Sequence, residues 1–567
     1  MVYHVRQKGT VKSPIAFTLG LVALLAQPGV LSIHAQTTSG TLTTDETWSG
    51  TVVLTGDVTV PAGATLTAQP GAVIKGRSYF QSIFVRGGLV AKGLTGAPVV
   101  FTSEANSGPD EWGGIVFEDG SHGILEQAEL RYGGGESAAM LEVNDTAEVT
   151  VRDCLFRRSG EDGIRVRRVE DPNRMRIESC RFEQNSGNGI ECNDASPTIS
   201  ASQFVANEGG AIYLTGNSYP VFAGDLVADR DGIWLRGATL TRSGTREYAG
   251  IPYILDGDVT VSAGVRLVIE PGVIVKVDSY FNSIVVDGQM DIQGAAEAPV
   301  VFTSLTDDSV GGDTNADGGA TTPAGDEWGG VYFNAGSTGT VEHAEFRYGG
   351  GESAGMIEIN NADQVEVRNT VLRRSGEDGI RVRKGADPAR VRIEGCWFDA
   401  NADDAIECND SSPAIFASRF TKNEGGPIYL TGTSFPSFRG DLQADWGGIL
   451  MAAVTLSAGG TREFAGIPYV LGGDQVVPAG VRVVIEPGVI VKGNSYFHSL
   501  FVDGVLELTG TSEAPIIFTA WADDSAGGDT NGDGETTKPK PDAWGGIVFN
   551  AGSTGLVEHA EFRYGGG

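Results

Sequence analysis

Basic residues, cysteine and long hydrophobic runs are all scarce in this 567-residue chain. Lysine and arginine together number 41 against 73 acidic residues, which gives a formal net charge of −32. Because nucleic acids and anionic membranes are bound by basic surfaces, this balance argues against both as partners and suits solubility or calcium binding. The five cysteines and six histidines show no zinc-type spacing and no Ser-His-Asp or Cys-His set.

One apolar run stands out, from Ile15 to Ala26 near the N-terminus. It follows three basic residues and precedes the small-residue sequence Ile33-His34-Ala35, an order typical of secretory signal peptides. The run is too short to cross a bilayer. We therefore predict that residues 1–35 are a signal peptide. The mature protein is expected to be secreted or exposed at the cell surface, without a membrane span.

Three phrases between Asp153 and Gly216 share one pattern: an aromatic residue, a corner rich in Gly and Asn, and an Ile eight residues later. Both series step by 26 and then 22 residues; they are Phe156, Phe182 and Phe204, and Ile164, Ile190 and Ile212. Apolar and polar residues alternate after each Ile, which is typical of half-buried strands. A repeat that cannot bury its own apolar face must stack on its neighbours. We predict an all-β parallel solenoid with coils of about 21–26 residues, in which the Phe side chains share one interior column and the Ile side chains another.

A longer repeat contains these coils. Trp112, Trp328 and Trp544 each precede Gly-Gly, at a constant step of 216 residues. We predict three superrepeats, residues 36–246, 247–462 and 463–567, and refer to them as copies one, two and three. The third is expected to be truncated and the natural polypeptide longer, because copy three stops where the earlier copies continue and solenoids avoid an uncapped edge.

These phrases resemble the right-handed parallel β-helix of the pectin-lyase-like superfamily, a carbohydrate-binding and sugar-hydrolase type of solenoid, in its secreted bacterial form. The resemblance covers nearly all of the chain after about Gln36. It implies the fold. It leaves the activity open, because this architecture supports many functions.

Copies two and three contain an inserted acidic loop, at residues 307–326 and 523–542. Asp-Thr-Asn-Ala-Asp-Gly in one and Asp-Thr-Asn-Gly-Asp-Gly in the other look like the start of an EF-hand or dockerin-type calcium loop, although Ala324 or Lys540 replaces the final Glu. The alternative is a solvated acidic loop. The predicted calcium ligands are Asp307, Asp308, Asp313, Asn315, Asp317 and Asp326, and their counterparts Asp523, Asp524, Asp529, Asn531, Asp533 and Asp542.

Outward-facing strand positions predict a ridge of polar and aromatic side chains in each of the first two copies. The residues are Glu142, Arg165, Glu191 and Tyr213, and Glu358, Arg381, Glu407 and Tyr429. Such a ridge suits polysaccharide binding, and arginine beside acidic groups is similar to a pectate-lyase type of site. Cross-strand ion pairs worth about 0.2–1 kcal/mol each explain the same residues. Recurrence in register argues against catalysis and favours binding, because repeated weak sites add avidity.

The expected function is therefore that of a secreted or cell-surface, non-catalytic scaffold. It would bind glycans or another extracellular partner and carry calcium-stabilised loops. The alternative is a polysaccharide lyase or glycoside hydrolase acting on an acidic polysaccharide. A purely structural stalk is a third reading. Cys154 and Cys180 could meet on successive coils, but buried free thiols are the favoured interpretation.

Overall fold

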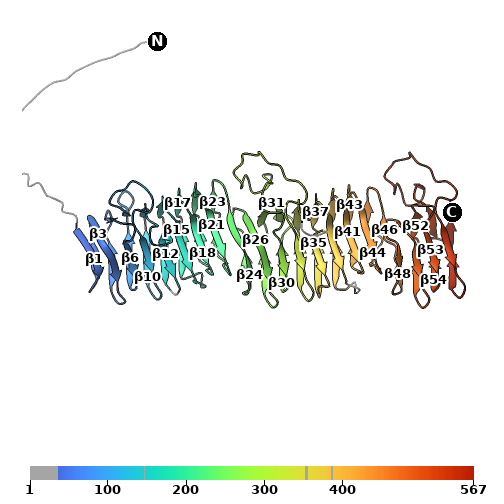
Figure 1. Cartoon of the computed structure of the whole chain (residues 1–567), viewed down its shortest axis with the longest axis horizontal. Helices are drawn as coiled ribbons and strands as arrows, with labels where there is room; N and C mark the ends of the chain where they lie inside the picture. The colour runs from blue at the N-terminus through green and yellow to red at the C-terminus, as the bar shows by residue number, and fades with distance from the viewer. Residues whose placement is uncertain (1–35, 146, 352–354, 385–386, 388, 567) are drawn as a thin grey trace, which may run out of the picture.

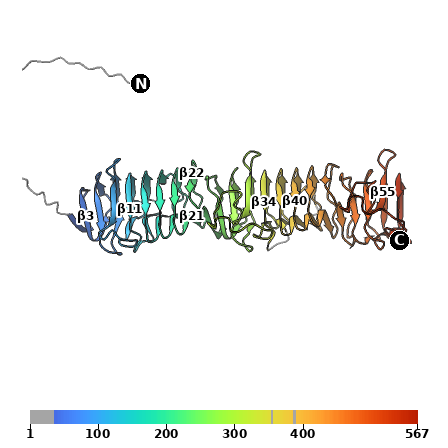
Figure 2. The same ribbon diagram turned by 90° about the horizontal axis from the view of Figure 1, so that it is seen from above.

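Parallel strands stack along one axis to form a long, narrow prism (Figures 1 and 2). The computed structural model describes residues 36–566 apart from 146, 352–354, 385–386 and 388, so the predicted signal peptide lies outside the described residues. No helix occurs in this part of the chain, and hence no helical segment of the length and hydrophobicity of a membrane span. The predicted right-handed parallel β-helix is confirmed.

Each coil consists of three short strands joined by tight corners. In one coil these are β14 (Leu155–Arg157), β15 (Asp162–Arg167) and β16 (Met175–Glu178), and in the next β17 (Arg181–Glu183), β18 (Asn188–Asn193) and β19 (Thr198–Ser200). A Cβ on Gly163, near the start of β15, would lie 2.7 Å from the Gly189 carbonyl oxygen and 2.8 Å from the Phe182 ring. The close stacking of coils therefore requires glycine there.

Three strands of a coil give the prism three sides. In copy one the first side also contains β5 (Val73–Gly76), β8 (Val99–Ser103), β11 (Ala128–Arg131) and β20 (Gln203–Val205), and the second contains β6 (Ser82–Val85), β9 (Gly114–Phe117), β12 (Ala139–Asn144) and β21 (Gly210–Thr215).

In copy two the first side contains β28 (Ile274–Val277), β31 (Val300–Ser304), β34 (Ala344–Arg347), β37 (Val371–Arg373), β40 (Trp397–Asp399) and β43 (Arg419–Thr421). Its second side contains β29 (Ile284–Val286), β32 (Val331–Phe333), β35 (Gly355–Asn360), β38 (Asp378–Arg383), β41 (Asp404–Asn409), β44 (Gly426–Thr431) and β46 (Ile449–Met451). In copy three, β52 (Ile490–Gly493) and β55 (Ile516–Ala520) lie on the first side, and β50 (Gln475–Val477), β53 (Ser499–Val502) and β56 (Gly546–Phe549) on the second.

The predicted interior columns form within a copy. Phe156, Phe182 and Phe204 pair in register, and their rings stack at centroid distances of 5.1 Å for both contacts. Ile164 pairs with Ile190 in the neighbouring column. All of these side chains are buried. The five cysteines are buried too and are free thiols.

The columns do not stay separate where one copy joins the next, contrary to the sequence-based expectation. In β24 (Ile233–Leu240) and β26 (Tyr253–Val261) the chain runs through two sides in one long strand. The Ile column of copy one therefore continues through Ile233, Tyr253 and Val275 into Phe302, which belongs to the Phe column of copy two. Because the hydrogen-bonded ladder is unbroken there, one sheet extends through the described part of the chain.

Candidate functional site

The predicted ridge of copy one exists as a column but its charges are largely occupied. Glu142, Arg165, Glu191 and Tyr213 pair in this order across β12, β15, β18 and β21. Glu142 and Glu191 are only 9% and 8% exposed. Arg165 Nη2 lies 3.0 Å from Glu191 Oε1, and Arg167 Nη1 lies 3.4 Å from Glu142 Oε1. The tyrosine is therefore the member of this column with an accessible surface that is not committed to an ion pair.

Copy two repeats the same arrangement. Glu358, Arg381, Glu407 and Tyr429 pair in register, Arg381 forms an ion pair with Glu407, and Arg383 Nη1 lies 3.3 Å from Glu358 Oε1. Burial raises the pKa of the half-buried Tyr429, and nearby carboxylates add to this shift. These contacts agree with the cross-strand ion-pair interpretation and leave little of the ridge free to hold a ligand.

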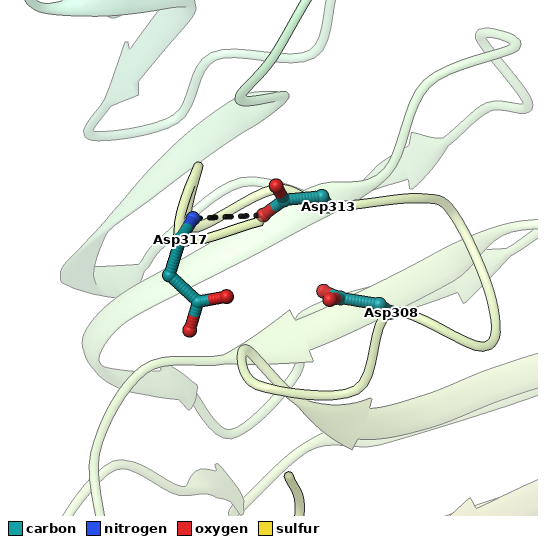
Figure 3. A group of neighbouring side chains, drawn as sticks. All are labelled: Asp308, Asp313 and Asp317. Atoms are coloured by element: carbon teal, nitrogen blue, oxygen red, sulfur yellow. Dashed lines mark hydrogen bonds between the residues drawn. The ribbon is translucent and has the colours of Figure 1, made fainter. Parts of the chain in front are cut away.

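Part of the predicted calcium set comes together in the copy-two loop. Carboxylate oxygens of Asp308, Asp313 and Asp317 lie within 4.8 Å of one another (Figure 3). The Asp317 backbone N–H donates to Asp313 Oδ1 at 3.1 Å, so the loop curls around these groups. Asp308 Oδ1 is buried without a hydrogen-bond partner among the described residues. Burial raises the pKa of Asp308, and the negative charge of Asp313 raises it further. An orphaned carboxylate oxygen facing two other carboxylates is a donor set that fits a hard cation.

Other members of the predicted set have different partners. Asp307 accepts hydrogen bonds from the Thr303 hydroxyl at 2.7 Å and from Arg347 at 3.2 Å. In copy three, Asp523 pairs likewise with Thr519 and Arg563. The structure therefore places Asp307 and Asp523 in a support beneath each loop. Asp326 is not in the carboxylate group either, because its side chain lies over the corner at Gly376.

Each acidic loop also has an internal ammonium group. Lys276 has no exposed surface and donates from Nζ to the Gly312 carbonyl at 2.6 Å, while Lys492 donates to Gly528 at 2.7 Å. Burial lowers the pKa of Lys276, whereas nearby aspartates act in the opposite direction. The same cause lowers the pKa of Lys492 to about 8. Part of the loop's negative charge is thus balanced by the protein itself.

A second carboxylate group, missed in the sequence, lies at the start of β38 and β41. Oxygens of Asp378, Asp403 and Asp404 lie within 4.8 Å of one another. Asp378 and Asp404 are 3% and 6% exposed, and Asp404 Oδ1 lacks a hydrogen-bond partner among the described residues. Burial, reinforced by the neighbouring carboxylates, raises the pKa of Asp378 to about 9 and that of Asp404 to about 8. Three close carboxylates in this setting hold protons at neutral pH or take up a cation.

Copy one lacks this group, although its fold is the same. Gly187 and Asn188 stand at the positions of Asp403 and Asp404. The Asn188 side-chain amide donates to Asp162 Oδ1 at 3.0 Å, and its backbone N–H donates to the same oxygen at 2.7 Å. Comparing the two copies position by position could have revealed this difference from the sequence alone.

Exposed aromatic pairs were also missed, although Ser-Tyr-Phe occurs in each copy. Tyr79–Phe80, Tyr280–Phe281 and Tyr496–Phe497 each form an edge-to-face pair with centroids 5.0–5.1 Å apart. We call these the aromatic dyads. Their phenylalanines are 65%, 65% and 78% exposed. Each dyad lies in the corner just before β6, β29 or β53.

Comparison with known protein families gives two matches. A family described as "Right handed beta helix region" matches residues 139–245 and 324–442, and one described as "Pectate-lyase like beta helix domain" matches residues 37–140 and 241–358. Together they cover residues 37–442 continuously. No curated protein and no solved structure matches the chain.

Proposed function

This chain belongs to the right-handed, pectate-lyase-like β-helix proteins, and on that premise we propose that it is a secreted or cell-surface, non-catalytic scaffold that binds glycans. The observation that carries the proposal is the set of three aromatic dyads. A large aromatic side chain left in water forgoes a burial energy of about 1.5–3 kcal/mol, so its repeated exposure points to an interaction surface. The C–H face of a sugar ring is apolar and flat and can cover such a ring.

The spacing of the dyads suits an extended polymer. Eight steps of strand stacking separate β6 from β29, and eight more separate β29 from β53. At about 4.8 Å per step, successive dyads are about 38 Å apart along the axis. A long polysaccharide can contact several dyads at once, and each weak contact then raises the avidity of the others.

Binding to a glycan array, followed by titration calorimetry with the best ligand, tests this proposal. Phe80→Ala, Phe281→Ala and Phe497→Ala should weaken binding stepwise, and the triple variant should lose it. Tyr248→Ala removes a ring of 49% exposure outside the dyads and is the matched control. Unchanged binding by the triple variant would refute the dyads as the glycan-binding surface.

Calcium is proposed as the ion that orders the acidic loops. The chemistry of the Asp308, Asp313 and Asp317 carboxylates and the orphaned Asp308 oxygen support this proposal. Asp524, Asp529 and Asp533 would serve in copy three, where Asp524 Oδ1 is likewise buried without a partner among the described residues and the Asp533 N–H donates to Asp529 at 3.2 Å, as in copy two. When bound, the ion would neutralise mutual repulsion within the loop.

A second candidate function is hydrolysis of an acidic polysaccharide in copy two. The group at Asp378, Asp403 and Asp404 favours it, because buried Asp404 with a raised pKa could protonate the leaving oxygen while the nearby carboxylate of exposed Asp403 attacks the sugar, forming a covalent intermediate that water then hydrolyses. Release of reducing ends from an acidic polysaccharide, abolished by Asp404→Asn but not by Asp162→Asn in copy one, would support this candidate. Glycan binding without turnover would exclude it for the glycans tested.

A further inference from the structure

The loop after the first side of the prism is held down by a glutamate in copies one and two. In copy one, Glu111 accepts hydrogen bonds from the hydroxyl groups of Ser103 and Ser107. In copy two, Glu327 accepts them from Ser304 and Thr306, and also from the Ala324 backbone N–H at 2.9 Å. In both copies the carboxylate joins the end of a strand to the loop that follows it.

Copy three has lost this anchor. The positions of Ser304, Thr306 and Glu327 are occupied by Ala520, Ala522 and Ala543. These three substitutions remove the carboxylate and two of its hydroxyl partners, which in copy two join the loop to the strands. A cavity of about 890 Å³ lies between them, lined by the three alanines. This volume is within the range of about 300–1,000 Å³ that is typical of small-molecule sites.

The walls of the cavity combine an apolar floor with polar groups that lack partners. Trp521, which replaces Leu305 of copy two, lies beside the alanines. Its indole N–H and Asn531 Oδ1 are buried without hydrogen-bond partners among the described residues. A buried donor or acceptor left unmatched costs about 1–3 kcal/mol, so both groups favour a ligand with hydroxyl groups.

The outer wall is the sequence Lys538-Pro-Lys540-Pro, in a chain that is otherwise strongly acidic. Two prolines restrict the backbone and keep this arm extended over the cavity. Lys538 Nζ lies 3.2 Å from Oε2 of the exposed Glu535, and no ion pair is found for Lys540 within the part of the chain that the structure describes. Asp533 and Asp542 also line the cavity, and Asp533 Oδ2 already accepts hydrogen bonds from Asn531 at 3.0 Å and from Thr537 at 2.6 Å.

We propose that this cavity, which we call the copy-three pocket, binds a carboxylated sugar. The sugar's apolar face rests on Trp521 and the alanine floor, its hydroxyl groups meet the indole N–H and Asn531, and its carboxylate faces Lys538 and Lys540. The pocket would thus give copy three a preference for acidic glycans. The inference deepens the proposed glycan-binding function and rests on it, but the dyads and the pocket use different residues.

The test compares a trisaccharide of β-1,4-linked glucuronic acid with cellotriose, its neutral counterpart, by titration calorimetry. The full chain is used with Phe80→Ala, Phe281→Ala and Phe497→Ala as background, so that the dyads do not contribute. Glucuronate trisaccharide should bind more tightly than cellotriose. Lys538→Gln together with Lys540→Gln should lower the affinity for the glucuronate trisaccharide about tenfold, while the affinity for cellotriose changes less than about threefold.

A closing variant gives the sharper result. Ala520→Ser, Ala522→Thr and Ala543→Glu together recreate the anchor of copy two and should abolish binding, with a circular dichroism spectrum and melting temperature at least equal to those of the background protein. Trp521→Ala should abolish binding with the pocket open. Equal affinity for the two trisaccharides, no binding of either, or undiminished binding by the closing variant would overturn the pocket. None of these results bears on glycan binding by the dyads, which the dyad variants test separately.

Discussion

Asp404→Asn should stabilise copy two at neutral and alkaline pH, and the reciprocal Asn188→Asp should destabilise copy one. The first change gives copy two the residue that copy one uses at the same position. An asparagine there can donate to Asp378, as Asn188 donates to Asp162 at 3.0 Å. It also removes a carboxyl group from the group formed with Asp403.

The pH dependence follows from the pKa of Asp404, which is raised to about 8 in the folded protein. Burial is the main cause, and the negative charges of Asp403 and Glu407 add to it. An aspartate in an unfolded chain has a pKa of about 3.9. Between these values the folded state binds more protons than the unfolded state, so stability is greatest below about pH 4 and falls as the pH rises towards 8. At about 1.4 kcal/mol per pH unit, the loss at pH 7 is at most about 4 kcal/mol. Solvent near exposed Asp403 screens the charges and reduces this loss of stability. We therefore expect Asp404→Asn to raise the free energy of unfolding by about 1–3 kcal/mol at pH 7 and by almost nothing at pH 4.

Hydrogen exchange measured by mass spectrometry is the suitable assay, because a solenoid can unfold in parts and a single melting curve would average over its coils. Peptides from 378–409 and from 162–193 report on the two copies, between pH 5 and 8 and in the presence of a chelator. Protection of 378–409 should rise in Asp404→Asn, and protection of 162–193 should fall in Asn188→Asp. If neither variant changes the pH dependence of its own copy, the assigned proton binding is refuted.

Three further predictions concern the stack, the corners and the loops. Phe182→Ala should lower the free energy of unfolding by about 3–5 kcal/mol, because the Phe182 ring lies between two other rings. Phe156→Leu should lower it by less than about 1.5 kcal/mol, because copy two has leucine at the equivalent position. Chemical denaturation measures both changes. Gly376→Ala should lower the free energy of unfolding by about 1–3 kcal/mol, because the new Cβ would lie 2.0 Å from a carboxylate oxygen of Asp326. Gly108→Ala is the control and should leave the free energy of unfolding unchanged in the same assay, because no atom lies within 4 Å of the position of its Cβ. Calcium should raise the melting temperature of the wild-type protein, and a chelator should reverse the rise. Asp313→Ala combined with Asp529→Ala, the equivalent change in copy three, should remove this response. A wild-type melting temperature that does not change with calcium would contradict the proposed calcium-binding loops.

Several features of the site required the packed structure because they depend on which coils touch. Asp378 and Asp403 are 25 positions apart in the chain and meet only because successive coils stack with a small spacing. The partner of Asp307 is Arg347, one coil further on, although the local motif suggested a cation. The copy-three pocket likewise lies where copy three lacks the hydrogen bonds that Glu327 makes in copy two. The sequence shows the replacement of Glu327 by alanine, but only the structure shows which contacts that replacement removes.

By itself the sequence determined the stacking of strands, because a Phe and an Ile recurring once per coil can be buried only in shared interior columns. It also determined the acidic loops and the register of the charged ladder, since strand residues alternate strictly between interior and surface. The tertiary structure decided between the two interpretations of the ladder, because its charges are paired, and it alone showed that the Ile column of one copy becomes the Phe column of the next. It decided too that aromatic dyads stay exposed and that a cavity opens in copy three. These outcomes depend on the space left between coils and loops, and side-chain periodicity does not specify that space.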